Sequence, residues 1–197
     1  MRFLLVLMLG LLAQGALALP AQVVLIRHAE KPDDPDALHL SDKGRERAQA
    51  LVKFFTQDRR LTKYGPPVAL YATQVTRRGH SQRTGETLEP LAKELSLPIL
   101  MPRESEDFKK VAKEILRNPA YEGKTVVVCW VHEYLPEMAA AFGVQPEPSK
   151  WKDSVFDRAY VITFTAKGKI KFDYMPQKLL PGDAKYKPKS TETATAR

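Results

Sequence analysis

The sequence predicts a layered α/β fold with a mostly parallel central sheet. Short apolar runs rich in β-branched residues alternate along the chain with segments whose apolar residues recur at helical spacing. The two strongest runs, Val23–Ile26 and Thr125–Val131, are continuously apolar. Strands that are buried on both faces, as in a parallel sheet, have this pattern. Ligands of such folds gather at the carboxyl ends of the strands, so functional residues are expected there.

The size and composition fit one globular domain. The chain has 197 residues, of which 44% are hydrophobic and 27% charged, and this excludes a disordered or collagen-like protein. Its single cysteine, Cys129, cannot form an internal disulfide. The 31 Lys and Arg residues outnumber the 23 Asp and Glu residues, and the net charge of +8 favours an anionic partner or substrate. We expect no specific nucleic-acid partner.

The first residues have the pattern of a secretory signal peptide. Arg2 precedes an apolar stretch, Phe3–Ala13, and small residues follow two apart at Ala16 and Ala18. The stretch is shorter than the ~20 residues that span a bilayer. We therefore expect cleavage after Ala18, no transmembrane span in the mature chain, and a periplasmic or secreted protein. An uncleaved N-terminal anchor is the alternative.

Strands and helices alternate after this segment. Val23–Ile26 predicts the first strand, and Ser41 is placed to cap a helix whose apolar residues follow at i, i+3, i+4 and i+7. Pro98 and Asn118-Pro119 mark the ends of the next two helices. The other elements predicted in this part are strands at Val68–Tyr71 and Ile99–Met101, and helices from about Gln82 and at Phe108–Leu116.

A second strong strand and a hairpin complete the predicted fold. Thr125–Val131 is the most hydrophobic strand after the signal segment, and Pro136 suits the first turn of a helix that Gly143 closes. The last two strands are predicted as a hairpin at Tyr160–Thr165 and Lys169–Tyr174. Residues 181–197 lack periodic apolar residues and predict a poorly ordered tail, which leaves residues 19–180 as the folded domain.

Two of the four histidines, His28 and His132, directly follow the two strongest strands. The carboxyl ends of parallel strands meet at one edge of a sheet, so both imidazoles are expected in one crevice. A neutral imidazole is a competent nucleophile towards phosphorus, and a guanidinium matches two phosphate oxygens. Arg27-His28 therefore predicts a nucleophile beside a phosphate clamp, in preference to plain structural histidines.

Four parts of the chain carry a resemblance to a known family. The first, Leu25–Lys31, has the sequence Leu-Ile-Arg-His-Ala-Glu-Lys. The others follow in order at Leu40–Ala48, at Leu70–Thr73 with Arg83–Leu88, and at Val126–His132. Together they resemble the histidine phosphatase superfamily, which includes the phosphoglycerate mutase-like enzymes. The first part is similar to the family's Arg-His-Gly-Glu signature, with Ala29 in place of Gly.

This resemblance implies a three-layer α/β/α sandwich of the phosphoglycerate mutase-like type. It also implies that His28 is phosphorylated transiently while Arg27, Arg83 and His132 hold the phosphoryl oxygens, without a metal or a cofactor. The chemistry of the residues agrees, because two arginines and two histidines make a positive pocket that stabilises a transferring phosphoryl group.

The leaving oxygen needs a proton, and two carboxylates are candidates to supply it. Glu133 is preferred, because in the acid phosphatase branch of the family an acidic residue directly follows the second histidine. Glu104 is the alternative, since the mutase-like branch places its acid in the loop after the Arg-bearing helix. For either residue, a surface salt bridge is the competing interpretation.

Further residues are candidates for contacts around the phosphoryl site. Arg77 and Arg78 precede the Arg-bearing helix in a stretch longer than the family spacing, so either is an alternative second clamp or contacts a distal anionic part of the substrate; exposure to solvent is the competing interpretation. Lys31 is a candidate for the mouth of the site. The outer wall is predicted, by position alone, at Met101–Tyr121 and Gln145–Pro148.

The predicted function is therefore an exported phosphatase that hydrolyses a phosphomonoester through a phosphohistidine on His28. The expected substrate is a phosphorylated small molecule or a phosphorylated envelope component. A phosphomutase is the alternative within the same chemistry, disfavoured because a chain this short has little length for closing loops. A non-catalytic binder of a phosphorylated envelope component is the alternative outside it.

Overall fold

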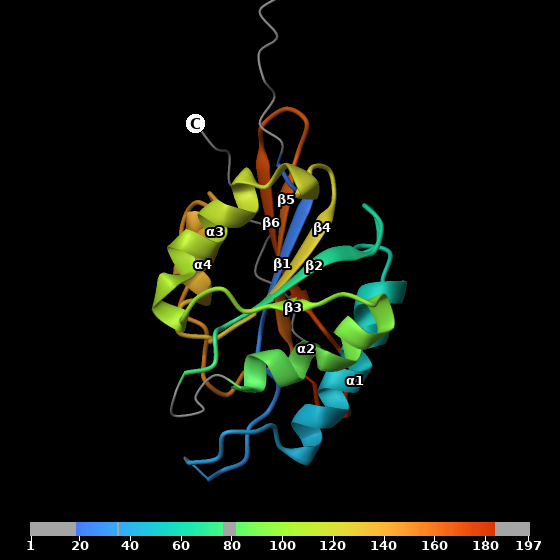
Figure 1. The fold of residues 1–197 in the computed structure, drawn as a ribbon, viewed down its shortest axis with the longest axis vertical. Helices are drawn as coiled ribbons and strands as arrows, with labels where there is room; N and C mark the ends of the chain where they lie inside the picture. Colours follow the sequence, from blue (N-terminus) through green and yellow to red (C-terminus); the bar gives the residue numbers. More distant parts are fainter. Residues whose placement is uncertain (1–18, 35, 77–81, 184–197) are drawn as a thin grey trace, which may run out of the picture.

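The chain folds around a six-stranded sheet, seen in a computed structural model that describes residues 19–34, 36–76 and 82–183 (Figure 1). The strand order is β3-β2-β4-β1-β5-β6. In chain order the elements are β1 (Gln22–Arg27), α1 (Asp42–Gln57), β2 (Pro67–Ala72), α2 (Gln82–Leu95), β3 (Ile99–Leu100), the 3-10 helix η1 (Ser105–Asp107), α3 (Phe108–Arg117), the 3-10 helix η2 (Pro119–Tyr121), β4 (Thr125–Trp130), α4 (Leu135–Ala141), β5 (Arg158–Phe164) and β6 (Ile170–Pro176).

The sheet is mostly parallel. β1 pairs in parallel with β4, β4 with β2, and β2 with β3. β5 runs antiparallel to both β1 and β6, so it alone opposes the other strands. β1 and β4 are buried along their whole length, which explains why their sequences are continuously apolar.

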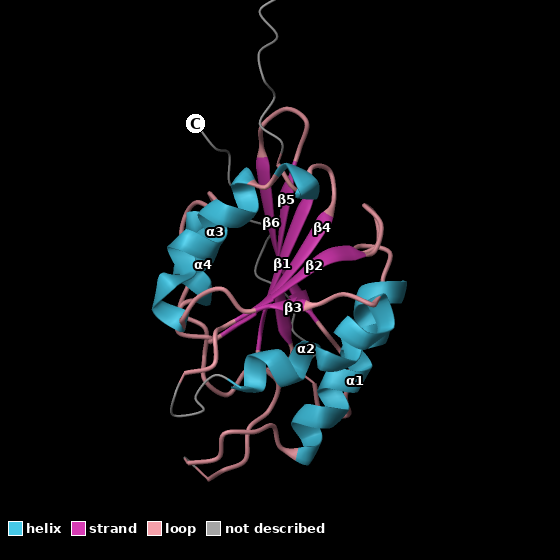
Figure 2. Cartoon of the chain, viewed as in Figure 1, coloured by secondary structure: helices cyan, strands magenta, loops and turns pink. Residues whose placement is uncertain are grey.

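Helices cover both faces of the sheet (Figure 2). α1 and α2 lie on one face, where Leu51 and Leu88 share a hydrophobic core with Ile26 of β1. α3 and α4 lie on the other face, where Ile115 joins a second core with Leu25, the neighbouring residue of the same strand. The three-layer α/β/α sandwich with a mostly parallel sheet is confirmed.

The predicted strands and helices are all present, with boundaries that differ by one or two residues. Ser41 caps α1 as expected, and its side chain accepts a hydrogen bond from the amide of Gly44 at 3.1 Å. Among the described residues, no helix is long and apolar enough to cross a bilayer. The predicted signal segment, residues 1–18, lies outside the described residues.

The start of α1 packs directly on the loop that follows β1. The carbonyl oxygen of Glu30 accepts hydrogen bonds from the amide and the hydroxyl of Ser41, at 3.0 and 3.2 Å. A Cβ atom on Gly44 would lie 2.2 Å from the same oxygen, so only glycine allows this approach. The loop that carries His28 is thereby fixed against the helix.

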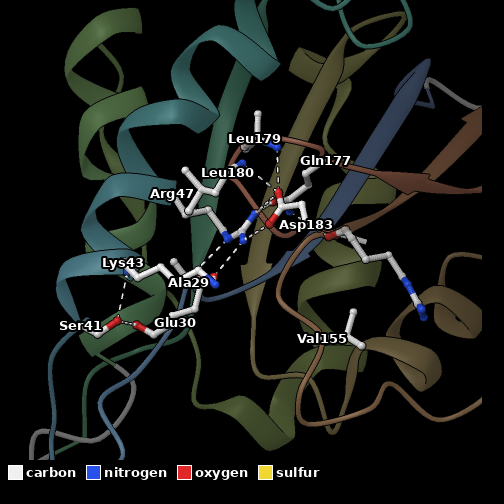
Figure 3. Close-up of polar contacts among 12 residues, drawn as sticks. Ala29, Glu30, Ser41, Lys43, Arg47, Val155, Gln177, Leu179, Leu180 and Asp183 are labelled. Carbon is white, nitrogen blue, oxygen red and sulfur yellow. Dashed lines mark hydrogen bonds and ion pairs between the residues drawn. The ribbon is translucent and has the colours of Figure 1, made fainter. Parts of the chain in front are cut away.

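A buried ion cluster also fixes this loop (Figure 3). The Arg47 side chain, only 2% exposed, donates to both carboxylate oxygens of Glu30, at 2.9 and 2.8 Å. It donates to both carboxylate oxygens of Asp183 as well, at 3.0 and 2.7 Å. The cluster therefore joins the loop after β1, helix α1 and the C-terminal segment. Asp183 falls in the segment predicted as a poorly ordered tail, and residues 184–197 of that segment lie outside the described residues.

Cys129 lies inside β4 and is fully buried in the core between the sheet and the helices α1 and α2. Burial raises the pKa of its thiol well above the ordinary value. A protonated, enclosed thiol is unreactive in the folded protein.

Candidate active site

The carboxyl ends of β1 and β4 meet at a cavity of about 750 Å³. His28 directly follows β1, and its amide donates to the carbonyl of Trp130, the last residue of β4, at 3.2 Å. His132 lies two residues beyond Trp130, and both histidines line the cavity. The structure thus brings together the two histidines that the strand ends point to. The cavity is also lined by Arg27, Lys31, Arg83, Glu133 and residues 150–153.

The His28 ring has a fixed tautomer. Its Nδ1 lies 2.7 Å from the carbonyl oxygen of Ala29, and since a carbonyl only accepts, Nδ1 carries the proton. Burial, together with the positive charges of Arg27 and Arg83, lowers the pKa of His28 to about 3. The ring is therefore neutral at physiological pH, and Nε2 keeps its lone pair. This is the state that a nucleophilic histidine requires.

Arg27 is held by a loop far away in the sequence. Its Nη1 donates to the carbonyl oxygens of Asp153 and Val155, at 2.5 and 3.2 Å. Its guanidinium carbon lies 3.9 Å from the centre of the Phe156 ring. Burial lowers the pKa of Arg27, and its Nε has no hydrogen-bond partner among the described residues. A buried cation with an unused donor favours binding of an anion.

Arg83, the second residue of α2, also lines the cavity. Its Nη1 donates to the carbonyl oxygen of Ala37, and its buried Nε has no partner among the described residues. Thr87, one helical turn later, accepts a hydrogen bond from the amide of Ala29 at 2.9 Å. This bond ties α2 to the residue after His28, so the helix that carries Arg83 and the loop that carries the nucleophile are held together.

His132 lies between two carboxylates. Its Nδ1 is 3.1 Å from Oε2 of Glu133, and its Nε2 is 3.3 Å from Oδ1 of Asp153. The same Oδ1 lies 3.3 Å from Nη2 of Arg27. The slight burial of Asp153 acts to raise its pKa, but Arg27 and His132 lower it. An ionised carboxylate oxygen thus sits between two groups that were predicted to bind phosphoryl oxygens.

Solved structures with the same arrangement of elements identify the fold, whereas no protein-family model and no curated protein matches the sequence. A candidate alpha-ribazole-5'-phosphate phosphatase from Escherichia coli has a TM-score of 0.54 at 15% identity, over 83% of this chain and 100% of its own. A mycobacterial glucosyl-3-phosphoglycerate phosphatase, solved with inorganic phosphate, has a TM-score of 0.50 at 14% identity, over 79% of this chain and 95% of its own. Both belong to the histidine phosphatase superfamily. The chain has the histidine phosphatase fold.

Glu133, the residue preferred from the sequence as the proton donor, is ionised in the free protein. The contact with His132 lowers the pKa of Glu133 to about 2, although partial burial acts in the opposite direction. A general acid must carry a proton before it can donate one. A further negative charge in the cavity, beside Asp153, would raise the pKa of Glu133, so the arrival of a phosphate dianion favours its protonation.

Part of the cavity wall was missed by sequence reasoning. The residues Lys150–Asp153 line the cavity, whereas the predicted wall segments Met101–Tyr121 and Gln145–Pro148 do not. That prediction of the outer wall is wrong. The loop has no periodic pattern that would place it. The available signal was Trp151, an aromatic residue among charged neighbours, which is fully buried and anchors the loop.

The remaining candidate site residues divide into three groups. Lys31 lines the cavity, as expected for its mouth. Glu104 is exposed, directly before η1, and is not a lining residue. Arg77 and Arg78 lie outside the described residues. Within residues 19–34, 36–76 and 82–183, no group of three or more His, Cys, Asp and Glu side chains is arranged to hold a metal ion.

Proposed function

We propose that the protein is a phosphatase that hydrolyses phosphomonoesters through a phosphohistidine on His28. The observation that carries this proposal is the state of His28: a neutral ring whose Nδ1–H is bound to the Ala29 carbonyl, which leaves Nε2 as the nucleophile. The phosphatase names of the structural neighbours support the same reaction class.

In the first half of the reaction, Nε2 of His28 attacks the phosphorus atom. The new P–N bond forms as the ester P–O bond breaks, and the bonding electron pair leaves with the ester oxygen. Arg27, Arg83 and His132 bind the phosphoryl oxygens and stabilise the charge that spreads over them. The Ala29 carbonyl accepts the Nδ1–H bond throughout and stabilises the ring as it becomes positive.

Proton transfer completes both halves. Glu133, protonated after the dianion has entered, gives its proton to the leaving oxygen and becomes a carboxylate. In the second half, water attacks the phosphohistidine, the P–N bond breaks, and the proton of that water passes to Glu133. Inorganic phosphate leaves, and His28 returns to its neutral state.

Hydrolysis of 4-nitrophenyl phosphate in the presence of a chelator tests the nucleophile. We expect His28→Asn to lose at least ~10³-fold in kcat, because the covalent route is removed. The wild type should also trap an acid-labile phosphate on His28. His39→Asn is the matched control, since His39 is exposed and lies outside the cavity.

Other outcomes of the same experiment separate the competing functions. Activity that survives in His28→Asn would overturn the proposed nucleophile. Phosphate esters that bind without turnover or label would indicate a non-catalytic binder. Transfer of the label to an added alcohol, with little release to water, would indicate a phosphomutase.

Esters with different leaving groups test the proton donor. Glu133→Gln should slow hydrolysis of an alkyl phosphate by about 10²-fold and that of 4-nitrophenyl phosphate much less, since nitrophenolate leaves without a proton. Glu104→Gln should leave both rates unchanged. A selective loss in Glu104→Gln instead would assign the acid to the alternative carboxylate.

The proposal extends to export and to the source of the substrate. Arg2, the apolar stretch Phe3–Ala13 and the small residues before Leu19 support a cleaved signal peptide and a periplasmic or secreted enzyme acting on phosphorylated small molecules or envelope components. Intact-mass measurement on protein from separated cell fractions tests this. A mature N-terminus at Leu19 is expected outside the cytoplasm, and a retained Met1 would contradict it.

A further inference from the structure

Three lysines stand on the wall of the cavity beside the residues that are proposed to bind the phosphoryl group. Lys31 comes from the loop after β1, and Lys150 and Lys152 come from the loop before β5. All three are exposed. Among the described residues, none of them takes part in an ion pair, unlike Lys43 and Lys110 elsewhere on the surface. Lys31 acts electrostatically on Asp153, but without a close ion pair its charge, like those of Lys150 and Lys152, can still contact an incoming group.

The loop that carries two of these lysines is anchored. Trp151, between them, is fully buried; its indole N–H donates to the carbonyl of Val155 at 2.8 Å, and its ring centre lies 4.7 Å from that of Tyr160. The next residue but one, Asp153, accepts the hydrogen bond from Arg27 described above. The backbone at both lysines is thus fixed beside the phosphoryl site, which reduces the entropy lost when their side chains bind a ligand.

The charge of the cavity exceeds what one phosphoryl group neutralises. Five Lys and Arg residues line it, against the two carboxylates of Glu133 and Asp153. Both carboxylates contact His132, and Asp153 also contacts Arg27. A phosphomonoester brings at most two negative charges. The wall formed by the lysines stays positive after that group has bound to the arginines.

The size of the cavity also leaves room for more than a phosphoryl group. A phosphoryl group has about five heavy atoms and fills on the order of 150 Å³, taking ~30 Å³ for each as for a water molecule. The cavity of about 750 Å³ leaves most of its volume to the rest of the substrate. The lysine-bearing wall borders this remaining volume.

We propose that Lys150 and Lys152, with Lys31, form a second anion-binding subsite, and that the substrates are phosphomonoesters carrying a second acidic group, a phosphate or a carboxylate. This proposal rests on the proposed phosphatase function, because it takes the site of His28 as the place of the first phosphoryl group. The lysines bind the second group in substrate and transition state alike, so they act on KM more than on kcat.

Binding of stable phosphonates tests the subsite without turnover. The probes are pentylphosphonate and pentane-1,5-bisphosphonate, with shorter and longer bisphosphonates to match the span, titrated by calorimetry in metal-free buffer at about 0.15 M salt. The wild type should bind the best bisphosphonate at least tenfold more tightly than pentylphosphonate, because each exposed charge pair contributes a factor of about two to five. Because either phosphonate group of the bisphosphonate can occupy the phosphoryl site, it binds twofold more tightly for this statistical reason alone.

Variants assign the preference to residues. Lys150→Ala combined with Lys152→Ala should reduce the preference for the bisphosphonate by about fourfold or more, and adding Lys31→Ala should bring it to the statistical factor of about two. Binding of pentylphosphonate should change less than threefold. Lys31→Ala should have a smaller effect in the same direction. Lys109→Ala combined with Lys113→Ala removes the same charge from exposed positions of α3 outside the cavity and should keep the preference.

The outcomes distinguish this proposal from the function on which it rests. Equal binding of both probes by the wild type, with 4-nitrophenyl phosphate hydrolysed, would overturn the second subsite and keep the phosphatase. A preference that persists in all the lysine variants would also overturn it. Failure of both probes to bind, without phosphatase activity, would overturn the phosphoryl site itself.

Discussion

Arg27 and Arg47 are equally buried, at 2% exposure each, yet their surroundings differ. Every nitrogen of the Arg47 guanidinium donates a hydrogen bond, and the acceptors include both oxygens of Glu30 and of Asp183 (Figure 3). Burial acts to lower the pKa of Arg47, but the hydrogen bonds to Asp183 and Glu30 outweigh it and raise the pKa. Its charge is fully balanced within the protein.

The charge of Arg27 is balanced only in part. It has two carbonyl acceptors and one carboxylate contact, to the exposed side chain of Asp153, and burial lowers its pKa. A buried guanidinium enclosed by carboxylates stabilises the fold, whereas one left with unused donors in a cavity is prepared for an anion from outside.

The largest effect expected is on stability, from Arg47→Met. This change leaves Glu30 and Asp183 without their cation, and breaking a buried pair in this way costs about 3–5 kcal/mol. Urea denaturation measures the loss. Arg45→Met, on the exposed face of the same helix, should change the free energy of unfolding by less than ~1 kcal/mol. A similarly small loss of stability in Arg47→Met would show that the Arg47 cluster does not stabilise the fold.

Arg27→Met should show the reverse pattern. We expect kcat for 4-nitrophenyl phosphate to fall by about 10²–10³-fold, since a donor that stabilises transition-state charge is lost. The free energy of unfolding should change by about 1 kcal/mol or less, because the buried cation removed was not fully compensated. Steady-state kinetics and urea denaturation on the same sample give both values. A large loss of stability with normal turnover would reverse the assignment.

Much of this contrast was not accessible from the sequence. The strands and helices could be predicted, because apolar runs such as Val23–Ile26 and the periodic spacing of apolar residues in α1 indicate which side chains are buried. Arg27 and His28 were also placed, since they directly follow a buried strand. The partners of Arg47 could not be predicted, because Asp183 is 136 residues away in the sequence and only the folding of the chain brings it next to Arg47.

The His28 site and the Arg47 cluster should also contribute to the pH dependence of the protein's stability in different ranges of pH. His28 has a pKa of about 3 in the folded protein against 6.5 ordinarily. Between these values the unfolded chain binds a proton that the folded chain does not, so stability falls as the pH drops below 6.5, by about 1 kcal/mol per unit. Burial alone would raise the pKa of Asp183, but Arg47 lowers it below 3.8, so its contribution is lost only below that pH.

Denaturation of His28→Asn between pH 6.5 and 4.5 measures the first range. The variant keeps a side-chain donor near the Ala29 carbonyl and has no titrating ring. Its stability should therefore depend less steeply on pH than that of the wild type. Equal slopes for the two proteins would show that His28 is not held neutral by the fold.

The smallest effect is expected from Asp153→Asn. The carboxylate of Asp153 contacts the same two groups, Arg27 and His132, that are proposed to bind phosphate. Removing its charge should tighten inhibition by inorganic phosphate about fivefold, since its exposed carboxylate no longer competes with phosphate for Arg27 and His132. Asp173→Asn, an exposed residue of β6 outside the cavity, should have no effect. Unchanged inhibition in Asp153→Asn would mean that this carboxylate does not compete.

The contacts of Asp153 show why the rest of the site could not be predicted. Loop 150–157 has no regular spacing, and its place beside Arg27 depends on Trp151 packing against Tyr160 in β5. Such long-range packing leaves no local pattern in the sequence. Of the proposed second subsite the sequence therefore indicated only Lys31, whereas the proposed nucleophile was indicated by its place directly after a strand.

Cys129 gives this fold a built-in measure of its own opening. The chain has one cysteine, and it lies fully buried in β4, which pairs with β1 and leads into His132. A thiol reagent reaches it only when α1 and α2 open away from the sheet or β4 itself unfolds, so the rate of labelling counts openings of the layer that packs on the active-site strands. A ligand that binds the closed cavity slows this labelling in proportion to its affinity, even when no chemical step follows.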